Sequence, residues 1–119
     1  VKLDNGTLDF VNTISYKNIN EIYLDYKYFE IDAIVIPNVK SQSVKLVNKE
    51  NKGIEFSYPK FSTLAIWTPY NEAPFICLEP WIGCADAPEA NHKFINKKDI
   101  IKLNVNEIWL TTYQIKING

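Results

Sequence analysis

The sequence predicts an all-β fold, and three observations support this interpretation. Apolar and polar residues alternate with a period of two along much of the chain, as they do in strands that are buried on one face. The alternating runs are rich in β-branched and aromatic residues, which favour strands. Pro, Gly or Asn separates one run from the next, and this arrangement is typical of antiparallel strands joined by short turns.

The first run that fits a strand lies between Glu21 and Phe29, where apolar and aromatic residues alternate with charged ones. The segment is ambiguous, but its aromatic content favours a strand over a helix. The apolar residues 33–36 form the next predicted strand, because Pro37 and Asn38 stop it.

A hairpin is predicted to follow. Residues 43–48 and residues 54–58 both alternate, and the polar turn sequence Asn51-Lys52-Gly53 lies between them.

The remaining segments are predicted in the same way. A strand over residues 64–67 precedes another over residues 75–79, which Pro80 ends. Residues 80–92 are predicted to form an extended loop, because no hydrophobic period is sustained along them. A brief turn or edge segment at 97–101 and a long final strand at 108–117 complete the chain.

Consecutive strands with apolar faces need a second sheet to cover them. A self-contained sandwich of 119 residues fits this requirement. Part of a larger sandwich fits equally, because the opening is rich in aromatic residues and the sequence starts at Val1 and contains no Met. We therefore expect a chain that is processed, cut, or a piece of something longer.

Composition excludes several classes of protein. A chain of 119 residues with 46% hydrophobic side chains and a net charge of −1 is globular and long enough for one domain. No run approaches the roughly 18–20 apolar residues of a membrane span, and no signal peptide opens the chain, so we expect a cytoplasmic protein without a membrane partner. Basic residues do not cluster, which argues against a nucleic-acid partner. All of them are Lys, which disfavours specialised phosphate binding.

The cysteine and histidine content predicts no metal site. Cys77 and Cys84 are not in CxxC spacing, and His92 is the only histidine, so the ligands of a tetrahedral zinc site are missing. We expect two half-buried, reduced thiols.

The residues around Glu79 are the strongest candidates for chemistry. An apolar strand carries Glu79 to its end, and a strand end beside a loop is a rigid place from which a catalytic group can point into a cleft. Trp81 has the kind of ring that stacks on the C–H face of a sugar. The alternative is an exposed glutamate at a strand end, with Trp81 in the core.

Three stretches of the sequence carry a family resemblance. They are Leu64-Ala65-Ile66-Trp67-Thr68, then Ala73-Pro74-Phe75-Ile76-Cys77-Leu78-Glu79-Pro80-Trp81 with Gly83 and Asp86, and residues 103–117 with Asn106-Glu107 before a long strand. They resemble the last part of the aldose 1-epimerase (galactose mutarotase-like) superfamily, in the branch that includes the lactose-operon X protein. The resemblance is strong from Phe61 onward, looser before it, and covers less than half of a typical member.

The resemblance implies a fold and a reaction. The fold is a large antiparallel β-sandwich, the galactose mutarotase-like supersandwich, of which residues 1–119 are the C-terminal portion. The reaction interconverts the α and β anomers of an aldose, with a hexose such as glucose or galactose as the substrate and without metal or cofactor. Glu79 matches the general base that removes the proton of the C1 hydroxyl. Asp32, which precedes an apolar strand, matches an aspartate that accepts hydrogen bonds from the sugar, and Trp81 is expected to line the same site.

The histidine acid of the family belongs to the N-terminal half, and His92 does not match it. We therefore expect the full-length protein to be an isomerase that needs that half, and these 119 residues alone to be inactive. For Asp32, the alternative is a turn residue at the entrance of a strand. For the protein, the alternatives are a non-catalytic carbohydrate-binding β-sandwich or an interaction domain with Trp81 in its core.

Overall fold

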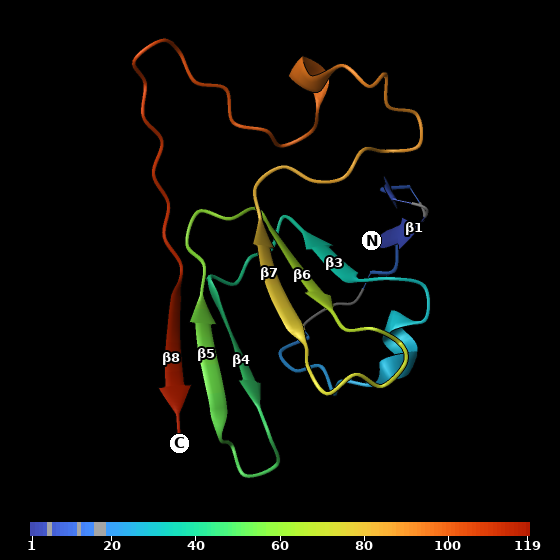
Figure 1. Cartoon of the computed structure of the whole chain (residues 1–119), viewed down its shortest axis with the longest axis vertical. Helices are drawn as coiled ribbons and strands as arrows, with labels where there is room; N and C mark the ends of the chain where they lie inside the picture. Colours follow the sequence, from blue (N-terminus) through green and yellow to red (C-terminus); the bar gives the residue numbers. More distant parts are fainter. Residues whose placement is uncertain (5, 12, 16–18) are drawn as a thin grey trace.

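The computed structural model, which describes residues 1–4, 6–11, 13–15 and 19–119, contains two antiparallel sheets (Figure 1). The first has five strands in the order β2-β1-β3-β6-β7, and the second has three in the order β4-β5-β8. The only helices in the described ranges are two 3-10 turns, so the predicted all-β, sandwich-like fold is confirmed. The elements are β1 (Lys2–Asp4), β2 (Thr7–Asp9), η1 (Tyr26–Phe29), β3 (Ile34–Pro37), β4 (Ser43–Val47), β5 (Gly53–Ser57), β6 (Thr63–Trp67), β7 (Cys77–Trp81), η2 (Phe94–Asn96) and β8 (Gln114–Asn118).

The predicted hairpin is present as β4 and β5, which pair antiparallel from Ser43 opposite Ser57 to Val47 opposite Gly53. Its turn is held by the side chain of Asn48, which accepts hydrogen bonds from backbone N–H groups inside the turn. Asparagine favours such turns because its short side chain can bond the backbone two residues ahead.

The two sheets share one apolar core. Its buried members come from β5, β6, η1 and the residue after β5, and Leu64 is only 1% exposed. The buried residues are Phe29, Phe56, Tyr58, Leu64 and Ile66.

The five-stranded sheet also buries part of its other face. Neighbouring residues of a strand point to opposite faces, and Ala65 of β6 belongs to a second cluster with Leu8 and Val35. Trp81 packs against this cluster at its border. The backbone N–H of Leu8 also donates to the carbonyl of Asp86, which ties β2 to the loop after β7.

The three-stranded sheet separates apolar from polar side chains. One of its faces carries two apolar rows across β4, β5 and β8, and the opposite face carries a charged row. The apolar rows are Val44, Phe56 and Ile115, and Leu46, Ile54 and Ile117; the charged row is Lys45, Glu55 and Lys116.

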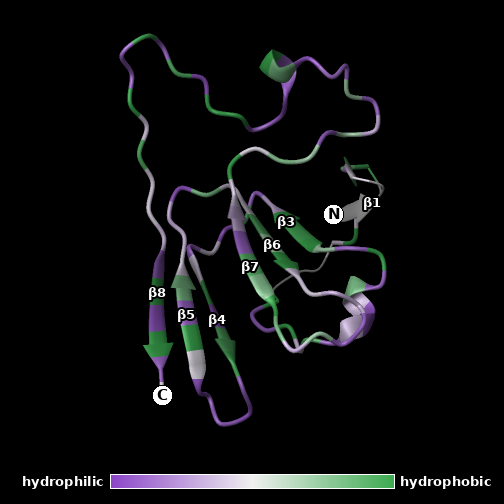
Figure 2. Cartoon of the chain, viewed as in Figure 1, coloured by the Kyte–Doolittle hydropathy of each residue, from purple (hydrophilic) through white to green (hydrophobic). Residues whose placement is uncertain are grey.

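The segment after residue 100 leaves many apolar side chains exposed. Figure 2 shows hydrophobic residues scattered along it as well as in the central strands. The large exposed side chains there include Leu103, Val105, Ile108, Leu110 and Ile117.

The predicted end of the strand at Pro80 is wrong. β7 extends to Trp81, and Pro80 lies opposite Leu64. β7 is an edge strand, where proline is tolerated because the N–H group that it lacks can face away from the neighbouring strand. Glu79 therefore lies at the middle of a strand rather than at its end.

The strand predicted over residues 21–29 is also wrong, because its second half forms η1 and no strand is assigned to residues 21–25. The carboxylate of Asp25 accepts a hydrogen bond from the N–H of Lys27 and caps the first turn. Phe29, at the end of η1, enters the core. Local capping and this one buried ring therefore prevail over the alternating pattern.

The long final strand predicted at 108–117 is shorter in the structure. β8 begins only at Gln114, which pairs with Ser57 at the end of β5. β5 ends at Ser57, and within the described ranges no strand pairs with residues 108–113, although Oγ1 of Thr111 donates to the carbonyl of Pro59 at 3.3 Å. Alternation alone does not make a strand where the ladder lacks a partner.

Other predictions are confirmed. Residues 33–36 and 64–67 coincide closely with β3 and β6. The segment after Trp81 is an extended loop that leads to η2, and a turn occupies part of residues 97–101. No helix in the described part of the chain has the length and apolar character to cross a membrane.

Candidate functional site

Glu79 and Trp81 lie on the same face of β7, because residues two apart in a strand point to the same side. The indole Nε1–H of Trp81 donates a hydrogen bond to Oε2 of Glu79, with a distance of 3.2 Å between the two atoms. Two of the three residues of the predicted site are thus in direct contact.

The residues beside Glu79 provide a small apolar floor. Glu79 pairs with Ala65 of β6, and Ala65 in turn pairs with Val35 of β3. Ala65 and Val35 are buried, and Trp81 packs against their cluster. The cluster covers this face of the sheet, and the side chain of Glu79 stands half-buried beside it.

One carboxylate oxygen of Glu79 is free for chemistry. Oε2 accepts from Trp81, whereas Oε1 makes no hydrogen bond or ion pair with any residue that the structure describes. A carboxylate with one oxygen fixed and the other available can accept a proton from a bound hydroxyl in a defined direction.

Asp32 lies two residues before β3 and is half-buried. Its Oδ1 accepts a hydrogen bond from the N–H of Ala33, at 2.7 Å, as expected for a turn residue at the entrance of a strand. Within the described ranges, Asp32 forms no hydrogen bond with Glu79 or Trp81. A hydrogen bond thus joins two of the three predicted site residues, Glu79 and Trp81, and Ala33, the neighbour of Asp32, packs against the same cluster as Trp81.

The loop after β7 is held by Asp86. Its Oδ1 accepts from the Nζ of Lys97 at 2.7 Å, and its Oδ2 lies 3.7 Å from Nδ1 of His92. The hydrogen bond from Lys97 is the main cause that lowers the pKa of Asp86 below its ordinary value. The His92 side chain is 82% exposed, which fits the prediction of a loop histidine.

Cys77 and Cys84 are both free and half-buried, as predicted. Burial raises the pKa of the Cys84 thiol, and the charge of Asp99 raises it further. Among the described residues, no group of three or more His, Cys, Asp or Glu could hold a metal ion.

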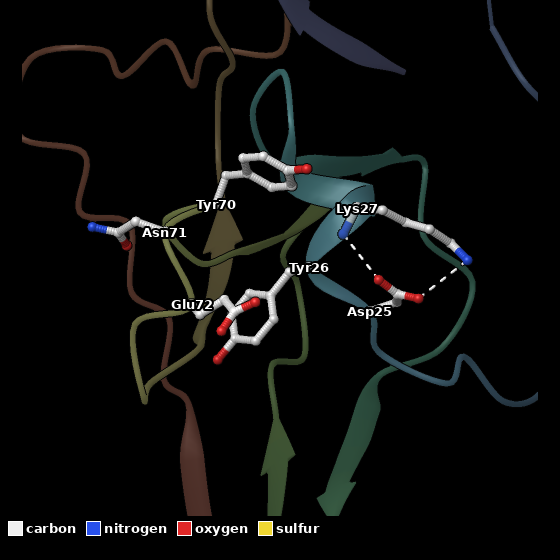
Figure 3. Close-up of a pocket in the computed structure, with 6 residues that line it drawn as sticks. All are labelled: Asp25, Tyr26, Lys27, Tyr70, Asn71 and Glu72. Carbon is white, nitrogen blue, oxygen red and sulfur yellow. Dashed lines mark hydrogen bonds and ion pairs between the residues drawn. The ribbon is translucent and has the colours of Figure 1, made fainter.

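The structure also shows a feature that sequence reasoning missed. An open hollow of about 540 Å³ lies between η1 and the loop from β6 to β7, and Figure 3 shows its side chains. A signal was available, because Tyr70-Asn71-Glu72 is an aromatic and polar turn between two strands. The lining residues are Asp25, Tyr26, Lys27, Tyr70, Asn71 and Glu72.

The chain is homologous to two proteins of Lactococcus lactis subsp. lactis, a plasmid and a chromosomal protein LacX. It is 32% identical to each over 116 residues, which cover 96% of this chain and 39% of the relative. The chain therefore spans about two fifths of the length of these curated relatives. No family model matches the chain. No solved structure matches it either.

Proposed function

We propose that this chain is the C-terminal portion of an aldose 1-epimerase-like β-sandwich that interconverts the α and β anomers of a hexose. The observation that carries the proposal is the Glu79–Trp81 pair, in which one carboxylate oxygen is held and the other is free. The homology to LacX proteins supports the branch that the sequence motifs indicate. It is also compatible with a role in carbohydrate metabolism.

In the proposed reaction, Oε1 of Glu79 removes the proton of the C1 hydroxyl. The ring oxygen receives a proton from an acid on the other side, the C1–O5 bond breaks, and the aldehyde forms. Rotation about C1–C2 and closure on the other face give the second anomer. A base and an acid are both needed, because the ring oxygen is a poor leaving group until it is protonated.

Trp81 has two roles in this proposal. Its Nε1–H fixes Oε2 and so orients the carboxylate. The exposed part of its ring is available to the C–H face of the sugar. Asp32 is proposed to accept hydrogen bonds from sugar hydroxyls with the oxygen that Ala33 does not occupy.

The acid is proposed to be a histidine outside these 119 residues, in an N-terminal half of the same sandwich. The exposed apolar residues of segment 101–117 support a larger fold, because an apolar surface of that extent is rare unless something covers it. We propose a cytoplasmic location and a reaction that uses no cofactor.

A non-catalytic carbohydrate-binding β-sandwich is the second candidate. It is favoured by the position of His92, the only histidine of the chain. His92 lies 3.7 Å from Asp86 in the loop after β7 and makes no hydrogen bond or ion pair with Glu79 in the part of the chain that the structure describes. The chain by itself thus offers a base without an acid.

Polarimetry of freshly dissolved α-glucose or α-galactose tests the proposal, with the protein at the full length of its relatives. We expect Glu79→Gln to lower the rate of anomerisation by about 10²–10⁴-fold, the usual contribution of a general base. Glu55→Gln, on the charged face of the three-stranded sheet, is the matched control and should leave the rate unchanged. Full activity of Glu79→Gln would refute the assignment, and sugar binding without any catalysis would establish the second candidate.

A further inference from the structure

The hollow between η1 and the β6–β7 loop has two tyrosine rings from different elements. Tyr26 belongs to η1, and its hydroxyl donates to the carbonyl of Ala73 at 3.0 Å, so this ring is fixed. Tyr70 follows β6, and 53% of its surface is exposed. Figure 3 shows the two rings among the residues that line the hollow. Such a pair offers one rigid and one accessible apolar surface.

The polar groups of the hollow include free hydrogen-bonding atoms. Glu72 and Asn71 are exposed and have no hydrogen bond or ion pair to any residue in the described part of the chain. Asp25 is engaged, because its Oδ1 accepts from the N–H of Lys27 and its Oδ2 lies 3.1 Å from Nζ of the same residue. The hollow therefore presents one free carboxylate, one free amide and one internally neutralised ion pair.

This charge arrangement discriminates between ligands. Two carboxylates and one ammonium group leave a net charge of −1 on the lining residues, which disfavours a phosphate or another anion. A neutral molecule with many hydroxyls suits the site, because carboxylate and amide groups bind hydroxyls and the rings take apolar C–H faces. The volume of about 540 Å³ falls within the range of about 300–1,000 Å³ that small-ligand sites occupy.

We propose that this hollow is a binding site for a neutral saccharide. Tyr70 supplies the stacking surface and Glu72 the main acceptor for hydroxyl groups. Neither Glu79 nor Trp81 lines the hollow, so the site is separate from the proposed base, and its existence does not depend on the proposed reaction.

Titration with maltose or lactose, followed by two-dimensional NMR of the backbone amides, tests the site. We expect saturable shifts at residues 25–27 and 70–72 at concentrations up to tens of millimolar. Tyr70→Ala should weaken binding by about 3- to 10-fold, as expected for one aromatic contact. Glu72→Gln should weaken binding while leaving the spectrum of the free protein intact.

Two control variants separate this site from others. Tyr23→Ala removes an exposed tyrosine outside the hollow, and Glu79→Gln removes the proposed base; both should leave these shifts unchanged. The proposal is overturned if no shift occurs in the hollow, or if Tyr70→Ala and Glu72→Gln bind like the unaltered protein. Stronger binding of glucose 6-phosphate or of choline would also overturn it. Loss of catalysis in Glu79→Gln with unchanged saccharide shifts would support both proposals, and the same shifts with no catalysis in any form would refute only the proposed reaction.

Discussion

The centre of the five-stranded sheet and the segment after residue 100 are both rich in apolar side chains, but they differ in what covers them. Leu64 of β6 is 1% exposed, whereas Val105 is 92% exposed and Ile117 of β8 is 81% exposed. An alternating apolar pattern therefore identifies side chains that are suited to burial. It does not show that residues of the same chain bury them.

This difference in burial follows from the number of neighbouring strands and packed clusters. β6 lies between β3 and β7 and has a cluster of buried residues on each face. β8 has one neighbouring strand, β5, and lies at the edge of the smaller sheet. Ile117 of β8 lies in one row with Leu46 and Ile54, and the side chains of this row are only partly buried. The central strand β6 thus supports the edge strand β7, which carries the candidate base Glu79, whereas β8 presents apolar surface to its surroundings.

The largest loss of stability should come from a substitution at the centre of the five-stranded sheet. We expect Leu64→Ala to lower the free energy of unfolding by about 2–5 kcal/mol, because it leaves a cavity between the two sheets. Urea denaturation followed by circular dichroism measures this change. Leu110→Ala, an exposed residue of the same type, should change it far less; equal losses in the two variants would contradict the contrast between the regions.

Gly53→Ala should have the next largest effect, at the junction of the hairpin. A Cβ at position 53 would overlap the backbone of Leu46 and Val47 on the paired strand, so the ladder must shift, at a cost of about 1–3 kcal/mol. The same denaturation measurement applies. Gly119→Ala, where a Cβ meets nothing, is the matched control, and an unchanged stability of Gly53→Ala would show that the hairpin is not packed as described.

Ile117→Thr should change the free energy of unfolding of the 119-residue chain by no more than about 0.5 kcal/mol, because the side chain is largely exposed and threonine keeps the strand preference. In a protein of the full length of the relatives, we expect a loss several times larger. A large loss already in the 119-residue chain, measured in urea, would mean that this row is covered within the chain itself.

The smallest expected effect is a local change in amide-exchange protection that depends on pH. The pKa of Asp86 is lowered by the hydrogen bond from Lys97, so this bond contributes fully above about pH 4, the range of an unfolded aspartate. Its contribution is lost as the pH falls below that value, through the lower pKa of the folded state. Amide-exchange protection at Leu8, whose N–H donates to the carbonyl of Asp86, should therefore decrease below about pH 4.

Lys97→Gln is the variant that checks the cause. It should reduce the protection of Leu8 near neutral pH and remove most of the acid-induced step. Protection that depends on pH to the same extent in both proteins would rule out Asp86 as the group responsible.

The site was only partly accessible from the sequence. The motif around Glu79 and Trp81 was sufficient to select both residues, since a spacing of two places them on one face of any strand. Their hydrogen bond, and the continuation of β7 through Pro80, depend on the edge position of that strand, which is a property of strand order. The hollow around Tyr70 joins residues more than forty positions apart, and no local pattern shows such a contact.

By itself, the sequence determined the strand class, the hairpin and the approximate limits of β3 and β6, because alternation and turn residues act over a few neighbouring positions. Only the tertiary structure decided which alternating segments became strands. Residues 108–113 alternate as clearly as β8, but in the described part of the chain no strand pairs with them, and η1 replaces a predicted strand and places Phe29 in the core. A strand exists where a neighbour completes its hydrogen bonds, and that neighbour is set by the fold as a whole.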